Sequence, residues 1–192
     1  METLIYNMRY CETEIKGAYI IEPEKKEDER GFFARSWDIK EFEEKNLNPK
    51  LVQCSISYNH TKGTLRGLHY QIKPYQEIKY VRCTRGKVFE VLVDLRPNSH
   101  TFKKWISVEL SAQNYRMIYA PEGCALGFQT LENETELFYQ MSEFYSPGYE
   151  RGLRYDDPIL NIEWPLAISI ISKRDLSFPY LDDAIEELLT RN

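Results

Sequence analysis

Short runs in which apolar and polar residues alternate make up most of the chain, and turn-forming residues separate them. The runs are rich in Val, Ile, Tyr and Phe, which favour a pleated, half-buried strand. The separators include Arg85-Gly86, Pro121-Glu122-Gly123 and Ser146-Pro147-Gly148, which are typical of turns. The predicted strands are 17–22, 51–57, 65–70, 78–84, 88–95, 104–110, 116–120, 124–130 and 135–143. Closely spaced strands without long helices between them predict an antiparallel sandwich or barrel.

Two helices are predicted, both at the edge of the fold. Asp38 and Glu41 resemble a capping box before Phe42, which predicts a helix of about two turns near 38–46. Near the end of the chain, Ile185, Leu188 and Leu189 recur at helical spacing over 182–189. The pattern as a whole therefore predicts an all-β fold with short peripheral helices.

The composition is that of an ordinary globular protein. The 192 residues are 42% hydrophobic, and 25 Lys and Arg against 30 Asp and Glu give a net charge of −5. This length predicts a single domain over residues 1–192, with a core large enough to fold without disulfides. The acidic balance argues against nucleic acid or an anionic membrane as the main partner. No run approaches the ~18 apolar residues of a membrane span, and the charged N-terminus lacks a signal peptide's apolar run, which predicts a cytoplasmic protein.

The spacing of the histidines and cysteines does not suit a metal centre. His60, His69 and His100 form no H-x-H pattern, and the cysteines form no C-x-x-C pair, whereas zinc and iron sites need several ligands at defined spacing. The glycines form no G-x-G-x-x-G or Walker pattern, so a nicotinamide or ATP site is unsupported. We therefore expect no metal and no cofactor, and an acid–base site built from side chains.

Alternation places three polar side chains on apolar strand faces: Lys79, Tyr139 and His69, the last sharing its face with Leu65 and Gly67. Each has an ordinary explanation as a satisfied core histidine, a packed tyrosine or a lysine that reaches solvent. Together inside a barrel they are costly unless they meet a polar ligand. An imidazole can remove a proton, an ammonium can stabilise an enolate oxygen, and a phenol can return a proton. This set therefore suits chemistry next to a carbonyl group.

Ordered motifs over about residues 15–185 make the chain recognisable. The run Gly63-Thr64-Leu65-Arg66-Gly67-Leu68-His69-Tyr70-Gln71 resembles the signature of the dTDP-4-dehydrorhamnose 3,5-epimerase family. Further matching segments follow in order: Arg30-Gly31-Phe32-Phe33, Val88-Phe89-Glu90-Val91, Val93-Asp94-Leu95-Arg96, Pro121-Glu122-Gly123, Gly127-Phe128, Tyr145-Ser146-Pro147, Asp156-Asp157-Pro158, Trp164-Pro165 and Ser172-Lys173-Arg174-Asp175. The resemblance implies a cupin-type jelly-roll β-barrel that acts without metal on a nucleoside-diphospho-4-keto-6-deoxysugar.

The resemblance also implies roles for the candidate catalytic residues. His69 matches the base that removes the proton next to the 4-keto group, and Asp175 matches the aspartate that holds this histidine. Lys79 matches the lysine that stabilises the enolate. Tyr139 matches the tyrosine that supplies a proton from the opposite face of the sugar. A base and an acid on opposite faces, with a cation near the oxyanion, are what inversion next to a ketone requires.

The remaining matches concern substrate binding and assembly. Arg66 matches an arginine that contacts the diphosphate, and Gln53 matches a contact on the nucleotide side. Arg174 replaces the lysine of the S-x-K-D motif. Arg30 and Phe33 match residues that reach the nucleotide of the neighbouring subunit. The resemblance therefore implies a homodimer whose N-terminal segment crosses to its partner.

One spacing conflicts with a regular strand. Arg66 and His69 are three residues apart, which in an uninterrupted strand sends their side chains to opposite faces. Gly67 lies between them and can form a bulge that brings both inward. We therefore expect an irregularity of the strand at Gly67.

Some positions depart from the family pattern. Leu126 occupies the place of a second pocket histidine, Arg35 replaces a glutamate near the base, and Ser55 replaces an asparagine. The catalytic set is kept, so we expect an epimerase that inverts C3, C5 or both of the sugar. A ketoisomerase-like relative and a silent cupin that only binds a sugar nucleotide remain alternatives. The choice of nucleotide and of carbon stays open at this level.

Overall fold

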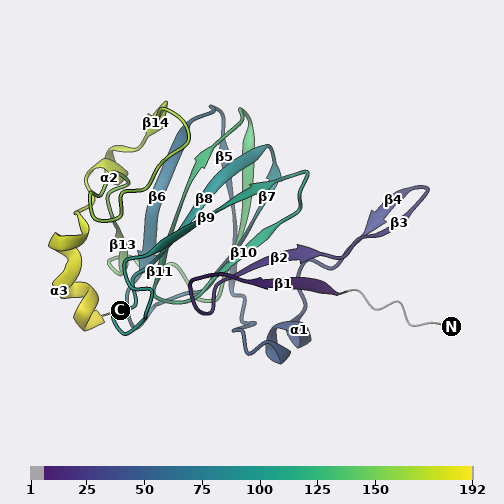
Figure 1. Ribbon diagram of the computed structural model, residues 1–192, viewed down its shortest axis with the longest axis horizontal. Helices are drawn as coiled ribbons and strands as arrows, with labels where there is room; N and C mark the ends of the chain where they lie inside the picture. Colours follow the sequence, from purple (N-terminus) through teal and green to yellow (C-terminus); the bar gives the residue numbers. More distant parts are fainter. Residues whose placement is uncertain (1–6, 192) are drawn as a thin grey trace.

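Two antiparallel sheets packed face to face form the centre of the computed structural model, which describes residues 7–191 (Figure 1). The first sheet has the order β1 (Met8–Glu12), β2 (Tyr19–Pro23), β10 (Met117–Ala120), β7 (Lys79–Arg85), β12 (Thr135–Met141), β5 (Gln53–Asn59). The second has the order β13 (Glu150–Gly152), β6 (Thr64–Gln71), β11 (Cys124–Thr130), β8 (Lys87–Asp94), β9 (Trp105–Ser111), and β14 (Ile170–Ile171) runs parallel to β6. A separate hairpin, β3 (Lys26–Asp28) and β4 (Gly31–Phe33), projects from the body of the molecule.

The predicted all-β class is confirmed, and each predicted strand overlaps an observed one. The structure adds the short strands β1, β3, β4, β13 and β14. These have two to five residues, and all three residues of β3 are charged and exposed. Segments this short contain too little alternation to be recognised, because their strand geometry comes from a neighbouring strand.

The two predicted helices also form. Asp38 is the N-cap of α1 (Ile39–Glu44), where its side chain accepts a hydrogen bond from the amide of Lys40. The second predicted helix is α3 (Leu181–Arg191). A third helix, α2 (Lys173–Leu176), was not predicted, because its four residues are too few to show a helical period. Its N-cap is Ser172, whose hydroxyl accepts from the amide of Asp175.

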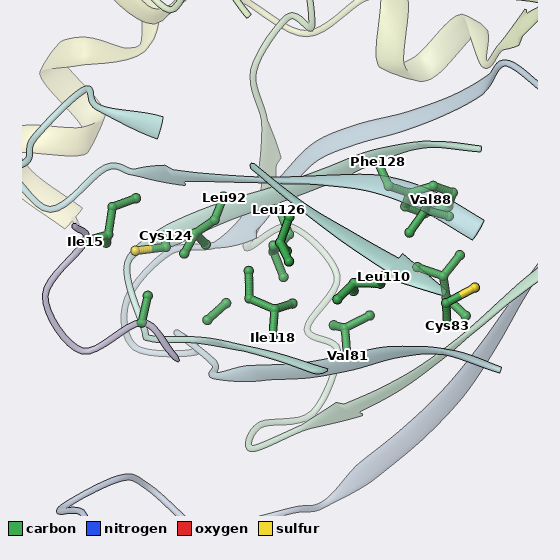
Figure 2. Close-up of a cluster of buried hydrophobic side chains, with 14 residues drawn as sticks. Ile15, Val81, Cys83, Val88, Leu92, Leu110, Ile118, Cys124, Leu126 and Phe128 are labelled. Atoms are coloured by element: carbon green, nitrogen blue, oxygen red, sulfur yellow. The ribbon is translucent and has the colours of Figure 1, made fainter. Parts of the chain in front are cut away.

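The main core lies between the two sheets. Val81 from the first sheet and Leu92, Leu110 and Phe128 from the second belong to this cluster, which Figure 2 shows. Each fully buried side chain of this kind contributes roughly 1.5–3 kcal/mol relative to an exposed one. This cluster holds the two sheets together. A cavity remains at one end of the space between them.

The outer faces of both sheets are covered as well. The aromatic ring of Phe42 in α1 packs edge-on against Tyr80 and Tyr119 on the first sheet. On the second sheet, α3 contributes Leu181 and Leu188 to a cluster built on the outward side chains of β6 and β8. In Figure 1 α1 and α3 accordingly lie at opposite sides of the molecule. Among the described residues, no helix is long and apolar enough to cross a membrane.

The expected irregularity at Gly67 is present and determines which side chains face inward. His69 lies opposite Leu126, and Arg66 lies opposite Phe128, so β6 has one residue more than β11 between these pairs. Residues directly opposite in an antiparallel pair share a face. Arg66 and His69 therefore both face the space between the sheets. The expectation that Leu65 shares the face of His69 is wrong, because the extra residue reverses the alternation.

Gly67 is required at this position by its conformation and by its neighbour. Its φ is +128°, and a Cβ atom built there would lie 2.5 Å from the Cα atom of Gly127. Real side chains avoid this backbone region and this separation. Two facing glycines, Gly67 and Gly127, thus permit the close contact of β6 and β11 beside the candidate site.

Gly67→Ala should therefore destabilise the fold by roughly 2–5 kcal/mol, because it adds both backbone strain and overpacking. Gly148→Ala is the matched control, since Gly148 also has a positive φ, +87°, but a Cβ atom built there would have no neighbouring atom within 4 Å. It should lose only about 1–2 kcal/mol. Denaturant unfolding measures both values. Equal losses in the two variants would contradict the tight packing inferred at Gly67.

Candidate active site

A cavity of about 410 Å³ opens between the two sheets at the end of the core. Its walls come from β5, β6, β7, β11 and β12. Residues of β13 and α2, and Tyr145 before β13, add to the lining. Most of the predicted site residues line it: Gln53, Arg66, His69, Lys79, Tyr139 and Arg174. The structure thus brings together side chains that are far apart in the sequence.

His69 is held by a buried carboxylate behind it. Its Nε2 lies 2.9 Å from Oδ1 of Asp175, whose side chain is only 6% exposed. The other oxygen, Oδ2, accepts from the amide of Gly67 at 3.3 Å. Burial opposes ionisation of Asp175, but the hydrogen bonds from His69, Gly67 and Ser172 together lower its pKa. Since an ionised carboxylate can only accept, Nε2 carries the proton and Nδ1 keeps the lone pair that a base needs.

Lys79 lies in the same cavity and is fixed by two acceptors. Its Nζ donates to the main-chain oxygen of His69 at 3.1 Å and lies 3.3 Å from Oε1 of Glu77. The ammonium is therefore connected to the backbone of the residue that carries the imidazole. Such a fixed, largely buried positive charge is suited to stabilise a developing oxyanion.

Tyr139 enters the cavity from the other sheet. It belongs to β12 of the first sheet, whereas His69 belongs to β6 of the second. Burial raises the pKa of Tyr139 well above its usual range, and the nearby carboxyl of Glu90 adds to this effect. The phenol is therefore protonated at neutral pH. A protonated phenol and an imidazole that come from facing sheets can reach a ligand from two sides.

Arg66 extends from β6 into the cavity. Its Nε donates to Oδ1 of Asn59 at 2.8 Å, and Asn59 is itself buried and bonded to the backbone oxygens of Ser57 and Thr135. Asn59 was not identified from the sequence, because an asparagine at the end of a strand is common and shows no special role. Because this hydrogen bond uses only the Nε–H of Arg66, its other guanidinium N–H groups remain suited to an anionic group in the cavity.

Polar groups also surround the mouth of the cavity. Oε1 of Gln53 accepts from the amide of Tyr145 at 2.6 Å. Arg174 lies 3.4 Å from Oε1 of Glu150, which also accepts from the hydroxyl of Tyr145. With Arg66, Arg174 gives this side of the cavity the positive charge that a diphosphate requires.

Comparison with known proteins decides which family this is. A family model described as dTDP-4-dehydrorhamnose 3,5-epimerase matches residues 12–183. The dTDP-4-dehydrorhamnose 3,5-epimerase of Shigella flexneri is 46% identical over 178 residues, which are 92% of this chain and 98% of the relative. The chain belongs to the dTDP-4-dehydrorhamnose 3,5-epimerase family.

Solved structures agree with this assignment. The dTDP-6-deoxy-D-glucose-3,5-epimerase of Legionella pneumophila, in complex with dTDP-4-keto-L-rhamnose, matches with a TM-score of 0.88 and 38% identity over 95% of this chain and 97% of that one. ChmJ, a 3'-monoepimerase from Streptomyces bikiniensis in complex with dTDP-quinovose, matches with a TM-score of 0.84 and 32% identity over 91% and 89%. The predicted cupin-type jelly roll of the epimerase family is thereby confirmed.

The departures from the epimerase pattern fall partly inside the cavity. Leu126 is 4% exposed, lines the cavity and lies directly opposite His69. Ser55 also lines it, whereas Arg35 does not and instead lies 3.4 Å from Asp38. The wall beside His69 is therefore apolar where the family pattern has a histidine.

Arg30 and Phe33 lie outside the cavity of their own chain. Both belong to the projecting hairpin of β3 and β4 (Figure 1), where Arg30 pairs with Asp28 and Phe33 is 61% exposed. The predicted role of these residues in a neighbouring subunit of the epimerase stays a prediction.

Two carboxyl groups near Lys79 were missed at the sequence level. Glu77 lines the cavity, and Glu90 is fully buried between the sheets with neither carboxyl oxygen hydrogen-bonded to any described residue. Burial raises the pKa of Glu90 well above its usual range, and the charge of Lys79 opposes that rise. The alternation of strand residues could have identified both carboxyl groups. Glu77 is two residues before Lys79 and so shares its face, and Glu90 likewise shares the inward face of Val88 and Leu92. Across residues 7–191, no group of three or more His, Cys, Asp or Glu is arranged to hold a metal ion.

Proposed function

We propose that this chain is an epimerase that inverts C3, C5 or both of a nucleoside-diphospho-4-keto-6-deoxysugar. The observation that carries the proposal is the presence of an Asp175-supported imidazole and a protonated phenol from facing sheets in one cavity with a fixed ammonium. Inversion needs a proton removed from one side of a carbon and another added from the opposite side. The arrangement in this cavity fits that requirement.

In the proposed reaction His69 takes the proton from the carbon next to the ketone. The electrons of the broken C–H bond form an enolate, whose oxygen the Lys79 ammonium stabilises. Tyr139 then gives its phenolic proton to the same carbon from the other side, which inverts the centre and restores the ketone. Exchange with solvent returns a proton to Tyr139 and removes one from His69. Asp175 keeps the imidazole oriented throughout.

The substrate class is supported by the relatives and by the mouth of the cavity. The Legionella epimerase was solved with a dTDP-linked 4-keto sugar. We assign the binding of a diphosphate to Arg66 and Arg174 and a nucleotide-side contact to Gln53, and we favour dTDP as the nucleotide. A single domain over residues 1–192 and a cytoplasmic location belong to the proposal as well.

We also propose a homodimer in which the hairpin of β3 and β4 reaches the cavity of the partner subunit. The support is that Arg30 and Phe33 match the family's nucleotide contacts while lying on a projecting hairpin outside their own cavity. Two neighbouring exposed phenylalanines, Phe32 and Phe33, on a projecting hairpin form an apolar surface that suits an interface.

His69→Asn should lower the rate of deuterium incorporation from D₂O into a dTDP-4-keto-6-deoxysugar by about 10²–10⁴-fold, because a positioned base is lost. Binding of dTDP should change little, since His69 is assigned no nucleotide contact. NMR of the sugar protons measures the exchange, and calorimetry measures dTDP binding. Exchange at the wild-type rate would rule out His69 as the base.

Leu126 should restrict the reaction to one carbon or to a sugar that lacks the corresponding hydroxyl. An apolar wall cannot pair a polar group of the ring, and the unpaired group costs about 1–3 kcal/mol. ChmJ provides a precedent for inversion of a single carbon on this fold. In D₂O the product should carry deuterium at one position, and Leu126→His should increase labelling at the other. Rapid, equal labelling of C3 and C5 by the wild type would show that Leu126 imposes no restriction.

The dimer can be tested by mixing two defective variants. His69→Asn has an intact hairpin, and the double variant Arg30→Ala with Phe33→Ala has an intact cavity. A mixed dimer should regain deuterium exchange at the wild-type KM in one of its two sites, the one that combines an intact cavity with the intact hairpin of the other subunit. The interface should bury about 2,000 Å² or more, so that it persists at micromolar concentration. A monomer in light scattering, or no recovery on mixing, would contradict the exchanged hairpin.

A further inference from the structure

A carboxylate beside Lys79 has no role in the reaction described so far. Oε1 of Glu77 lies 3.3 Å from Nζ of Lys79, and the two side chains are only 10% and 15% exposed. Nζ also donates to the main-chain oxygen of His69 at 3.1 Å. Glu77 and Lys79 both line the cavity. The ammonium is thus held between a carboxylate and the backbone of the proposed base.

We propose that Glu77 is a positioning residue of this site, which fixes the Lys79 ammonium so that its remaining N–H is directed at the enolate oxygen. The inference rests on the proposed function, because it assigns Lys79 to the enolate. Glu77 lies outside the sequence motifs by which this chain resembles the family.

The donor geometry of lysine supports this assignment. An ammonium has three N–H groups, and Glu77 and the oxygen of His69 engage two of them. The third is left for a ligand in the cavity. A lysine side chain is long and flexible, so without a second acceptor its Nζ can occupy several positions along the wall. Two fixed acceptors on one side limit the ammonium to one position before the substrate enters.

The surroundings of Glu77 explain why its carboxylate acts through Lys79 and not on the substrate. Burial raises the pKa of Glu77, and the adjacent charge of Lys79 opposes that rise. A free carboxylate in the cavity would repel an anionic enolate, whereas one paired with the ammonium leaves the pair nearly neutral. Two further carboxyl groups act on this pair: Glu143 affects Glu77, and the buried Glu90 interacts with Lys79. The other titratable or charged groups that line the cavity are His69, Arg66, Tyr70, Tyr139, Tyr145, Glu150, Arg151 and Arg174.

Substitutions at Glu77 separate positioning from charge. Glu77→Ala removes the acceptor, and Glu77→Asp keeps the charge but withdraws the acceptor by one methylene. Both should lower kcat for deuterium exchange by about 10–100-fold with KM nearly unchanged, because the ammonium is misplaced only slightly. Glu77→Gln keeps an acceptor oxygen at the same reach and should recover most of kcat. Glu143→Gln, which removes a charge near Glu77 without touching Lys79, should behave as the wild type.

A double-mutant cycle tests whether Glu77 acts through Lys79. In a Lys79→Met background, Glu77→Ala or Glu77→Asp should cause no further loss of kcat. Losses that multiply in the double variant, or a kcat unaffected by either substitution, would overturn the proposal. If Glu77→Ala does not fold, Glu77→Asp carries the same test. A wild-type protein that exchanges no deuterium would refute the proposed function instead, so the two failures are distinguishable.

Discussion

The hydrogen bond between His69 and Asp175 is the interaction on which the rest of the site depends. It joins β6 to α2, a helix of four residues whose start is fixed by the hydroxyl of Ser172. The same carboxylate accepts from the amide of Gly67, the residue at which β6 is irregular. The irregularity that turns Arg66 and His69 to one face and the carboxylate that orients the imidazole are therefore parts of one arrangement.

The chemistry of the cavity depends on whether each buried ionisable side chain has a hydrogen-bond or ion-pair partner. Hydrogen bonds lower the pKa of Asp175 despite its burial, whereas burial raises the pKa of Glu90, whose carboxyl oxygens have no hydrogen-bond partner among the described residues. Lys79 is paired with Glu77, so its charge is fixed in place. Burial also keeps the Tyr139 phenol protonated. Asp175 and Tyr139 are thereby held in the protonation states that their proposed roles require.

Much of this could be predicted from the sequence, for physical reasons that differ between residues. Strong alternation located the long strands, and the family motifs identified six of the residues that line the cavity, among them His69, Lys79 and Tyr139. Alternation failed at Leu65, because one extra residue at Gly67 changes the phase of β6. Glu77 and Asn59 were missed because their importance comes from a tertiary contact with Lys79 and Arg66. The match to the family motif singled out Arg30 and Phe33, but the hairpin that carries them was not predicted, and a single chain contains no contact that assigns them to a partner's site.

The central claim is that removal and return of the proton are carried out by different residues on opposite sides of the sugar. Tyr139→Phe separates the two steps, because it deletes the acid and leaves His69, Asp175 and Lys79 in place. The measurement is NMR of a dTDP-4-keto-6-deoxysugar in D₂O with this variant, following deuterium content and configuration at C3 and C5. The account predicts deuterium exchange with retention of configuration and little epimerised product. Inversion at the wild-type rate would contradict it.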